Sequence, residues 1–147
     1  MDIVNEKFTV FSRGFDDAID VTQRIKTIVS NSNAFEGLVT ISSTLPTVSF
    51  LRFENTKGLI TDIKNLLSSF VPVHKVYEHD NNWHDGNAYS HLKAMLMGNS
   101  ISFVITKGTM ELPFECSIVM IDFNNKSGEI PINVTVMFKT AESKKEQ

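Results

Sequence analysis

The four histidines of this 147-residue chain gather between positions 74 and 91, as His74, His79, His84 and His91. Carboxylates stand among them in the same stretch. An imidazole can ligate a metal ion, and it titrates near neutral pH. The stretch therefore predicts either an acid–base site or a metal site. Its spacing matches no standard zinc motif, because neither an HExxH sequence nor a pair of histidines four apart occurs.

The local sequence ranks these histidines. His79 stands in Tyr77-Glu78-His79-Asp80 and is the best candidate for chemistry, whereas His74 and His84 lie among polar residues and are expected to be solvated. His91 falls on the apolar face of a predicted helix, where a histidine is either a hydrogen-bonded core residue or a member of the same site as His79. The segment 72–86 is long for a loop in a small domain, and such loops are usually functional.

Three segments have the spacing of amphipathic helices. The first is predicted to begin at Asp16 or Asp17 as its cap and to run to about Ser30. The second spans about 57–69 and ends at Pro72. The third spans about 87–97, and Gly98 ends it. Glu54, just before the second helix, is either a carboxylate that stabilises the helix dipole or part of a site.

The remaining regular segments are predicted strands at residues 8–11, 38–43, 48–53, 101–106, 116–123 and 132–138. Segment 116–123 is almost wholly apolar, which predicts a central strand buried on both faces. The turn-forming run 124–128 before an alternating strand predicts a hairpin. Because strands come in consecutive groups, the fold class is α+β with antiparallel sheets, about three helices and one domain over residues 1–140. Residues 141–147 are expected to form a disordered polar tail.

Composition excludes several classes of protein. The net charge is −3 at pH 7, which argues against nucleic acid as a partner. The longest apolar runs are only a few residues, so no membrane partner is expected. Cys116 is the single cysteine, so no internal disulfide can form, and a cytoplasmic location is expected. Because it stands in an apolar run, Cys116 is expected to be a core residue rather than a nucleophile.

Several short motifs, taken in order, resemble the YjbQ-like family, also called the secondary thiamine-phosphate synthase family. The most specific is Tyr77-Glu78-His79-Asp80, whose histidine is followed twelve positions later by His91-Leu92-Lys93. The resemblance extends from about Phe8 to Phe138. The other matching motifs are Gly37-Leu38-Val39-Thr40, Phe53-Glu54-Asn55, Val71-Pro72, Asn87-Ala88, Gly98 and Lys107-Gly108.

The resemblance implies a compact α+β fold, a homotrimer, and sites near subunit boundaries. It implies an activity that joins an aminomethylpyrimidine diphosphate to a thiazole phosphate. Glu54, His79 and His91 are then the catalytic candidates. A diphosphate leaving group needs positive charge, so a divalent metal such as Mg²⁺ or Zn²⁺ is expected on His79 and His91, with Lys126 contacting phosphate.

The sequence also departs from the family pattern at three places. Where the family has His-Thr-Thr, this chain has Leu45-Pro46-Thr47, and a leucine can neither ligate a metal nor move a proton. Pro113-Phe114-Glu115-Cys116 replaces a Gly-Thr-Trp-Gln stretch, and the turn around Lys126 lacks the family's arginine. Two interpretations follow: an enzyme with a modified site, or a non-catalytic paralogue that serves as a binding or structural subunit.

Overall fold

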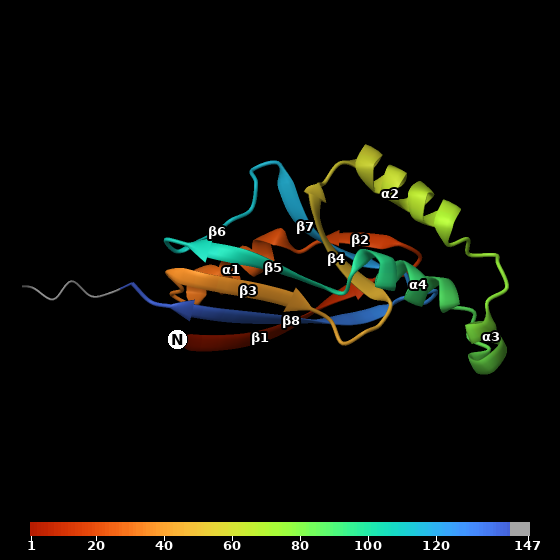
Figure 1. Ribbon diagram of the computed structural model, residues 1–147, viewed down its shortest axis with the longest axis horizontal. Coiled ribbons are helices and arrows are strands. Elements are labelled where there is room, and N and C mark those ends of the chain that lie inside the picture. Colours follow the sequence, from red (N-terminus) through yellow and green to blue (C-terminus); the bar gives the residue numbers. More distant parts are fainter. Residues whose placement is uncertain (142–147) are drawn as a thin grey trace, which may run out of the picture.

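A computed structural model describes residues 1–141 of the chain, so the predicted polar tail lies, apart from Ala141, outside the described residues. The described residues form eight strands and four helices (Figure 1). Their bounds are β1 Asp2–Ser12, β2 Asp17–Asp20, α1 Thr22–Asn31, β3 Glu36–Ser42, β4 Val48–Glu54, α2 Lys57–Phe70, α3 Glu78–Trp83, α4 Ala88–Met97, β5 Ser100–Thr106, β6 Thr109–Met110, β7 Cys116–Asp122 and β8 Gly128–Lys139.

The strands form two sheets in which every pair is antiparallel. The larger sheet has the strand order β1-β8-β3-β5-β6, and the smaller has the order β2-β7-β4. This arrangement confirms the predicted α+β class with antiparallel sheets. The predicted central strand is also confirmed, because β7 lies between two neighbours and Ile118–Asp122 are all buried.

The predicted hairpin after β7 is wrong. β7 pairs only within the small sheet, whereas β8 pairs with β1 and β3 in the large one. The turn at 124–127 therefore carries the chain from one sheet to the other. The β1–β2 connection bends beside it, because Gly14, Phe15 and Asp16 all have positive φ angles and the Phe15 N–H donates to the Asn124 carbonyl at 2.7 Å.

The predicted start of the first helix is also wrong. Asp17–Asp20 is strand β2, paired with β7, and the helix begins at Thr22. The Asp17 carboxylate accepts hydrogen bonds from the backbone and side chain of Arg13, each at 2.9 Å, and so does not cap a helix. The N-cap of α1 is Val21, and Asp20 just before it accepts a hydrogen bond from the Thr22 N–H at 2.8 Å.

The second and third predicted helices are confirmed as α2 and α4, and the predicted loop between them contains the short helix α3. The main core joins α1 to both sheets and includes Ile25 and Val29 of α1 together with its N-cap residue Val21. A smaller cluster joins β7 to Leu67 of α2 and Ala94 of α4. Among the described residues no helix is long and apolar enough to cross a membrane.

Candidate functional site

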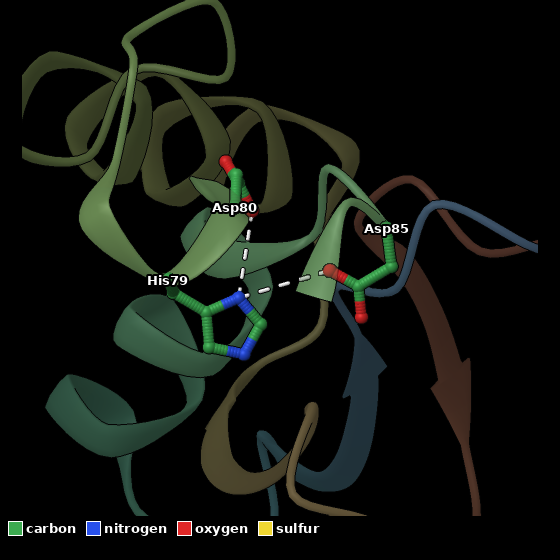
Figure 2. A group of neighbouring side chains, drawn as sticks. All are labelled: His79, Asp80 and Asp85. Carbon is green, nitrogen blue, oxygen red and sulfur yellow. Dashed lines mark hydrogen bonds and ion pairs between the residues drawn. The ribbon is translucent and has the colours of Figure 1, made fainter. Parts of the chain in front are cut away.

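The candidate site lies where α3 meets the beginning of α4. His84 is the C-cap residue that follows α3. Its φ of 55° and ψ of 26° are left-handed and end the helix after six residues. Gly86 follows with another positive φ of 63°. Two left-handed residues in close succession reverse the chain sharply, and a β-branched residue would resist such angles. The reversal returns Asp85 toward the side of α3 that carries His79 (Figure 2).

Figure 2 shows two carboxylates directed at one imidazole. The Nδ1 atom of His79 lies 3.5 Å from Asp80 Oδ1 and 3.7 Å from Asp85 Oδ1. One ligand atom from each of the three residues fits within 4.8 Å of the others. All three side chains are partly exposed, between 23% and 34%, so an ion or small molecule can reach them.

Asp80 is held in place by the following helix. Its Oδ1 accepts a hydrogen bond at 3.1 Å from the N–H of Ala88, the first residue of α4. This N–H belongs to the positive end of the helix dipole and has no partner within α4. The contact ties α3 to the beginning of α4.

His91 lies against His79. The centroids of the two rings are 4.9 Å apart, and the ring planes are tilted by 40°. Burial lowers the pKa of His91, and repulsion from the His79 imidazole lowers it further, although Asp85 and Asp80 oppose this. The structure thus brings together the two histidines predicted from sequence. The grouped ligand atoms, however, belong to His79, Asp80 and Asp85.

Glu54 lies elsewhere within the chain. It is the exposed last residue of β4, just before α2, whereas His79 is in the helix that follows the far end of α2 (Figure 1). Fourteen residues of α-helix span about 21 Å. Within residues 1–141, Glu54 shares no hydrogen bond or ion pair with either histidine.

Lys126 is exposed in the turn between β7 and β8. Its neighbour Asn125 donates from Nδ2 to the carbonyls of Asp85 at 2.8 Å and Gly86 at 3.4 Å. The turn that carries Lys126 therefore borders the site. In the described part of the chain the Lys126 ammonium forms no ion pair.

The sequence analysis did not select Asp80, Asp85 or Asn125 as site residues. Four buried side-chain oxygens here have no hydrogen-bond partner in the described structure: Asp85 Oδ1, Asn87 Oδ1, Asp122 Oδ2 and Asn125 Oδ1. All four atoms are hydrogen-bond acceptors. They lie on two segments, 85–87 and 122–125, which are held together by hydrogen bonds. Ser90 Oγ donates to the Phe123 carbonyl at 2.6 Å, and Asn125 contacts Asp85. The only signal in the sequence was the abundance of Asp and Asn around two turns.

An open pocket of about 460 Å³ borders the two histidines. Apolar groups of α4 form much of its lining, and Tyr77 precedes α3 at its edge. The lining residues are Tyr77, Glu78, His79, Ala88, His91, Leu92 and Met95. The pocket can hold an apolar or aromatic part of a ligand while a polar part reaches the carboxylates.

Comparison with known proteins agrees with this fold. A family model described as "UPF0047 protein YjbQ-like" matches residues 6–139. A UPF0047 protein of Methanothermobacter thermautotrophicus is 33% identical over 96 residues, which cover 65% of this chain and 66% of that protein. A UPF0047 protein of Archaeoglobus fulgidus is 32% identical over 108 residues, which cover 74% of this chain and 82% of that protein.

Solved structures show the same architecture. A YbjQ-like protein of unknown function from Sulfolobus solfataricus superposes with a TM-score of 0.88 at 22% sequence identity. The superposition covers 94% of this chain and 99% of the Sulfolobus chain. A hypothetical protein from Aeropyrum pernix gives a TM-score of 0.85 at 20% identity, covering 92% and 99%. With the family match over nearly its whole length, the chain belongs to the UPF0047 (YjbQ-like) family.

Proposed function

We propose that this domain binds a divalent metal ion through His79, Asp80 and Asp85, and that the ion holds the phosphate of a small phosphorylated ligand. The observation that carries the proposal is the convergence of one imidazole nitrogen and two carboxylate oxygens within 4.8 Å. One nitrogen and two oxygens suit Zn²⁺, whereas Mg²⁺ prefers oxygen ligands alone. This set of ligand atoms therefore favours Zn²⁺ over Mg²⁺.

The unpartnered oxygens beside the site support a cation. A buried acceptor without a donor costs about 1–3 kcal/mol, and four of them occur on facing segments. Asp85 carries one of these four oxygens and is also one of the three grouped residues. A bound cation can coordinate such an oxygen, whereas an apolar ligand cannot.

The reaction we favour is the thiamine-phosphate synthase-like transfer implied by the family. In it, a thiazole ring nitrogen forms a bond to the methylene carbon of an aminomethylpyrimidine diphosphate, and the bond from that carbon to the diphosphate oxygen breaks. The metal supplies positive charge to the departing diphosphate. The thiazole nitrogen carries no proton, so this displacement needs no base, and His91 at the edge of the apolar pocket can hydrogen-bond the bound ligand. Glu54 and Lys126 act in this scheme only if another copy of the chain or a bound ligand brings them to the site.

A second candidate is a non-catalytic binding subunit, and one observation favours it. Leu45, at the position where the family has a histidine, packs against the main core. A leucine there stabilises the fold and provides no chemistry. Under this alternative the metal and the phosphorylated ligand bind but no transfer follows.

We further infer that the protein acts as a homotrimer in the cytoplasm, as the family resemblance and the single cysteine suggest. A mass of 16.5 kDa in light scattering contradicts any oligomer.

The metal proposal is tested by calorimetric titration of the purified chain with Zn²⁺. Asp85→Asn removes one negative ligand and is expected to weaken binding at least ~10-fold, since even residues that only orient ligands change metal affinity by about 10–100-fold. His84→Asn is the matched control, because asparagine tolerates the left-handed angles at this position and His84 is exposed. Failure of the unmodified chain to bind Zn²⁺ at millimolar concentration, or equal affinities for Asp85→Asn and the unmodified chain, contradicts the proposal.

Catalysis is tested separately. We would measure thiamine-phosphate formation by the zinc-loaded chain and by its Leu45→His variant, with an active relative as the control. Product formed by the unmodified chain supports the enzyme. If both forms bind zinc and neither makes product, the binding subunit is the better description.

A further inference from the structure

Three buried side-chain oxygens beside the candidate site take no part in the proposed zinc site. They are Asn87 Oδ1, Asp122 Oδ2 and Asn125 Oδ1, and none of them has a hydrogen-bond partner in the described structure. Folded proteins keep few buried acceptors without donors, because each one costs about 1–3 kcal/mol. Three such atoms on two neighbouring segments therefore need an explanation.

Asp122 carries the only charge among the three. It is the last residue of β7 and is 0% exposed. Its Oδ1 accepts a hydrogen bond from the Asn124 N–H at 3.0 Å, which directs the carboxylate toward the β7–β8 turn and leaves Oδ2 without a donor. Within residues 1–141 Asp122 forms no ion pair, and the buried ammonium of Lys93 pairs with Asp16 instead. A buried carboxylate is costly unless a cation pairs with it.

Asn125 presents its amide oxygen because its amide nitrogen is already used. Nδ2 donates to the carbonyls of Asp85 at 2.8 Å and Gly86 at 3.4 Å. Turning the amide over would set Oδ1 against two carbonyl oxygens, so these two hydrogen bonds assign its orientation. The oxygen is therefore an acceptor that is held in one place.

Asn87 is the N-cap residue of α4, but its side chain does not cap the helix. An asparagine at this position commonly accepts a hydrogen bond from an N–H of the first turn. Here the backbone carbonyl of Asn87 accepts from the Ser90 N–H at 2.8 Å, whereas Oδ1 is buried and has no donor in the described structure. This oxygen is therefore available to a ligand.

The segments that carry the three oxygens are joined at the beginning of α4. The hydrogen bonds from Asn125 reach the two residues directly before Asn87. Burial raises the pKa of Tyr89 in the first turn of α4, and carboxylates that include Asp122 raise it further. The charge of Asp122 therefore acts on the same turn of α4 that Asn87 begins.

We propose that Asn87, Asp122 and Asn125 bind a hard divalent cation, Mg²⁺ or Ca²⁺, through their three side-chain oxygens, with water completing the coordination. One carboxylate and two amide oxygens, without nitrogen or sulfur, are ligands that such ions prefer. A water molecule alone could donate to two of the oxygens, but it carries no charge to balance the buried carboxylate. The proposal does not depend on the zinc site, because the two sites share no residue.

The test is calorimetric titration of the full chain with Mg²⁺ and, separately, with Ca²⁺. The unmodified chain is expected to bind at least one of them, and the tighter one identifies the cation. Asp122→Asn removes the carboxylate and is expected to weaken this binding at least ~10-fold. Asp62→Asn is the matched control, because Asp62 is exposed on α2 and the same substitution there should leave the affinity unchanged.

Thermal unfolding gives a second readout. In the chelator-treated protein Asp122→Asn keeps the shape of the side chain and supplies an amide donor near the unpartnered acceptors, so its midpoint should be equal or higher. The tighter cation should raise the midpoint of the unmodified chain but not that of Asp122→Asn. A merely structural Asp122 gives the opposite result: a lower midpoint without the cation and the same rise with it.

The outcomes separate this site from the zinc site. Zn²⁺ binding without Mg²⁺ or Ca²⁺ binding at millimolar concentration overturns only the site proposed here. Equal affinities of Asp122→Asn and the unmodified chain, or an equal loss in Asp62→Asn, also overturn it. Asn87→Ala repeats the test should Asp122→Asn fail to fold by circular dichroism. It removes a ligand oxygen that does not cap α4, and an unchanged affinity there overturns the proposal as well.

Discussion

At the scale of single residues, the site depends on His79 having two kinds of neighbour. Asp80 and Asp85 approach its Nδ1 atom, whereas His91 packs against its ring. The pKa of His91 is lowered by burial first and by the neighbouring His79 ring second. In the proposed metal site His79 is the nitrogen ligand, and His91 lies outside the three grouped residues.

His91 should titrate below its ordinary pKa of 6.5, because burial and the neighbouring His79 both disfavour its charged form. A lowered pKa means that the unfolded chain binds more protons than the folded one. The stabilising contribution is then complete above pH 6.5 and is lost as the pH falls toward the folded-state value. NMR titration of the metal-free protein measures the pKa directly.

The same effect should appear in unfolding. Urea unfolding of the metal-free protein at several pH values should show a loss of stability below pH 6.5 that is smaller in His91→Gln. A His91 pKa above 6.5 contradicts this account.

At the scale of elements, buried polar contacts fasten α4 to the small sheet and to the bend between β1 and β2. Lys93 has a side chain that is 0% exposed, and its Nζ atom bonds both carboxylate oxygens of Asp16 at 2.9 and 3.0 Å. Asp16 stands in the bend between β1 and β2 with a φ of 63°. Ser90 of α4 donates to the carbonyl of Phe123, directly after β7, and Ser49 of β4 donates to the carbonyl of Ala94 in α4. The helix that carries His91 is thus fixed by contacts from distant parts of the chain.

Removal of either partner of the Lys93–Asp16 pair should destabilise the fold. Lys93→Met leaves a carboxylate without its partner and is expected to cost about 3 kcal/mol, the lower end of the range for breaking buried pairs. Asp16→Asn, which keeps the left-handed angles, should cost a similar amount. The double variant should cost at least ~1 kcal/mol less than the sum. Urea unfolding of the four proteins checks this, and simple additivity contradicts it.

At the scale of the whole molecule, two bent connections join the sheets. The β1–β2 bend and the β7–β8 turn contact each other, so the chain passes between the two sheets twice at one place. Gly14 lies at this crossing with a φ of 71°. A methyl group on Gly14 would stand 2.5 Å from the Lys126 carbonyl oxygen.

Gly14→Ala should therefore destabilise the protein by about 2–4 kcal/mol, from left-handed strain together with overpacking. Gly58→Ala is the control, because nothing lies within 4 Å of the added carbon in α2 and alanine favours helix by up to ~1 kcal/mol. Thermal unfolding should show a lower midpoint for Gly14→Ala and an equal or higher one for Gly58→Ala. A tolerated Gly14→Ala contradicts the tight crossing.

Local periodicity and local stop signals were enough to predict the fold class, the helices α2 and α4, and the central strand β7. The sequence also indicated His79 and His91, since a cluster of titratable residues is visible without coordinates. The first helix was placed too early because Asp17 and Asp20 look alike as caps, and only pairing with β7 assigns 17–20 to a strand.

The tertiary structure alone decided which carboxylates join the histidines. Asp85 reaches His79 through two left-handed residues, and Asn125 comes to Asp85 from a turn forty residues away. The structure also separated β7 from β8, because a turn-forming sequence does not specify whether the chain reverses within one sheet or crosses to another. Such outcomes depend on contacts between distant segments, and local periodicity carries no information about these contacts.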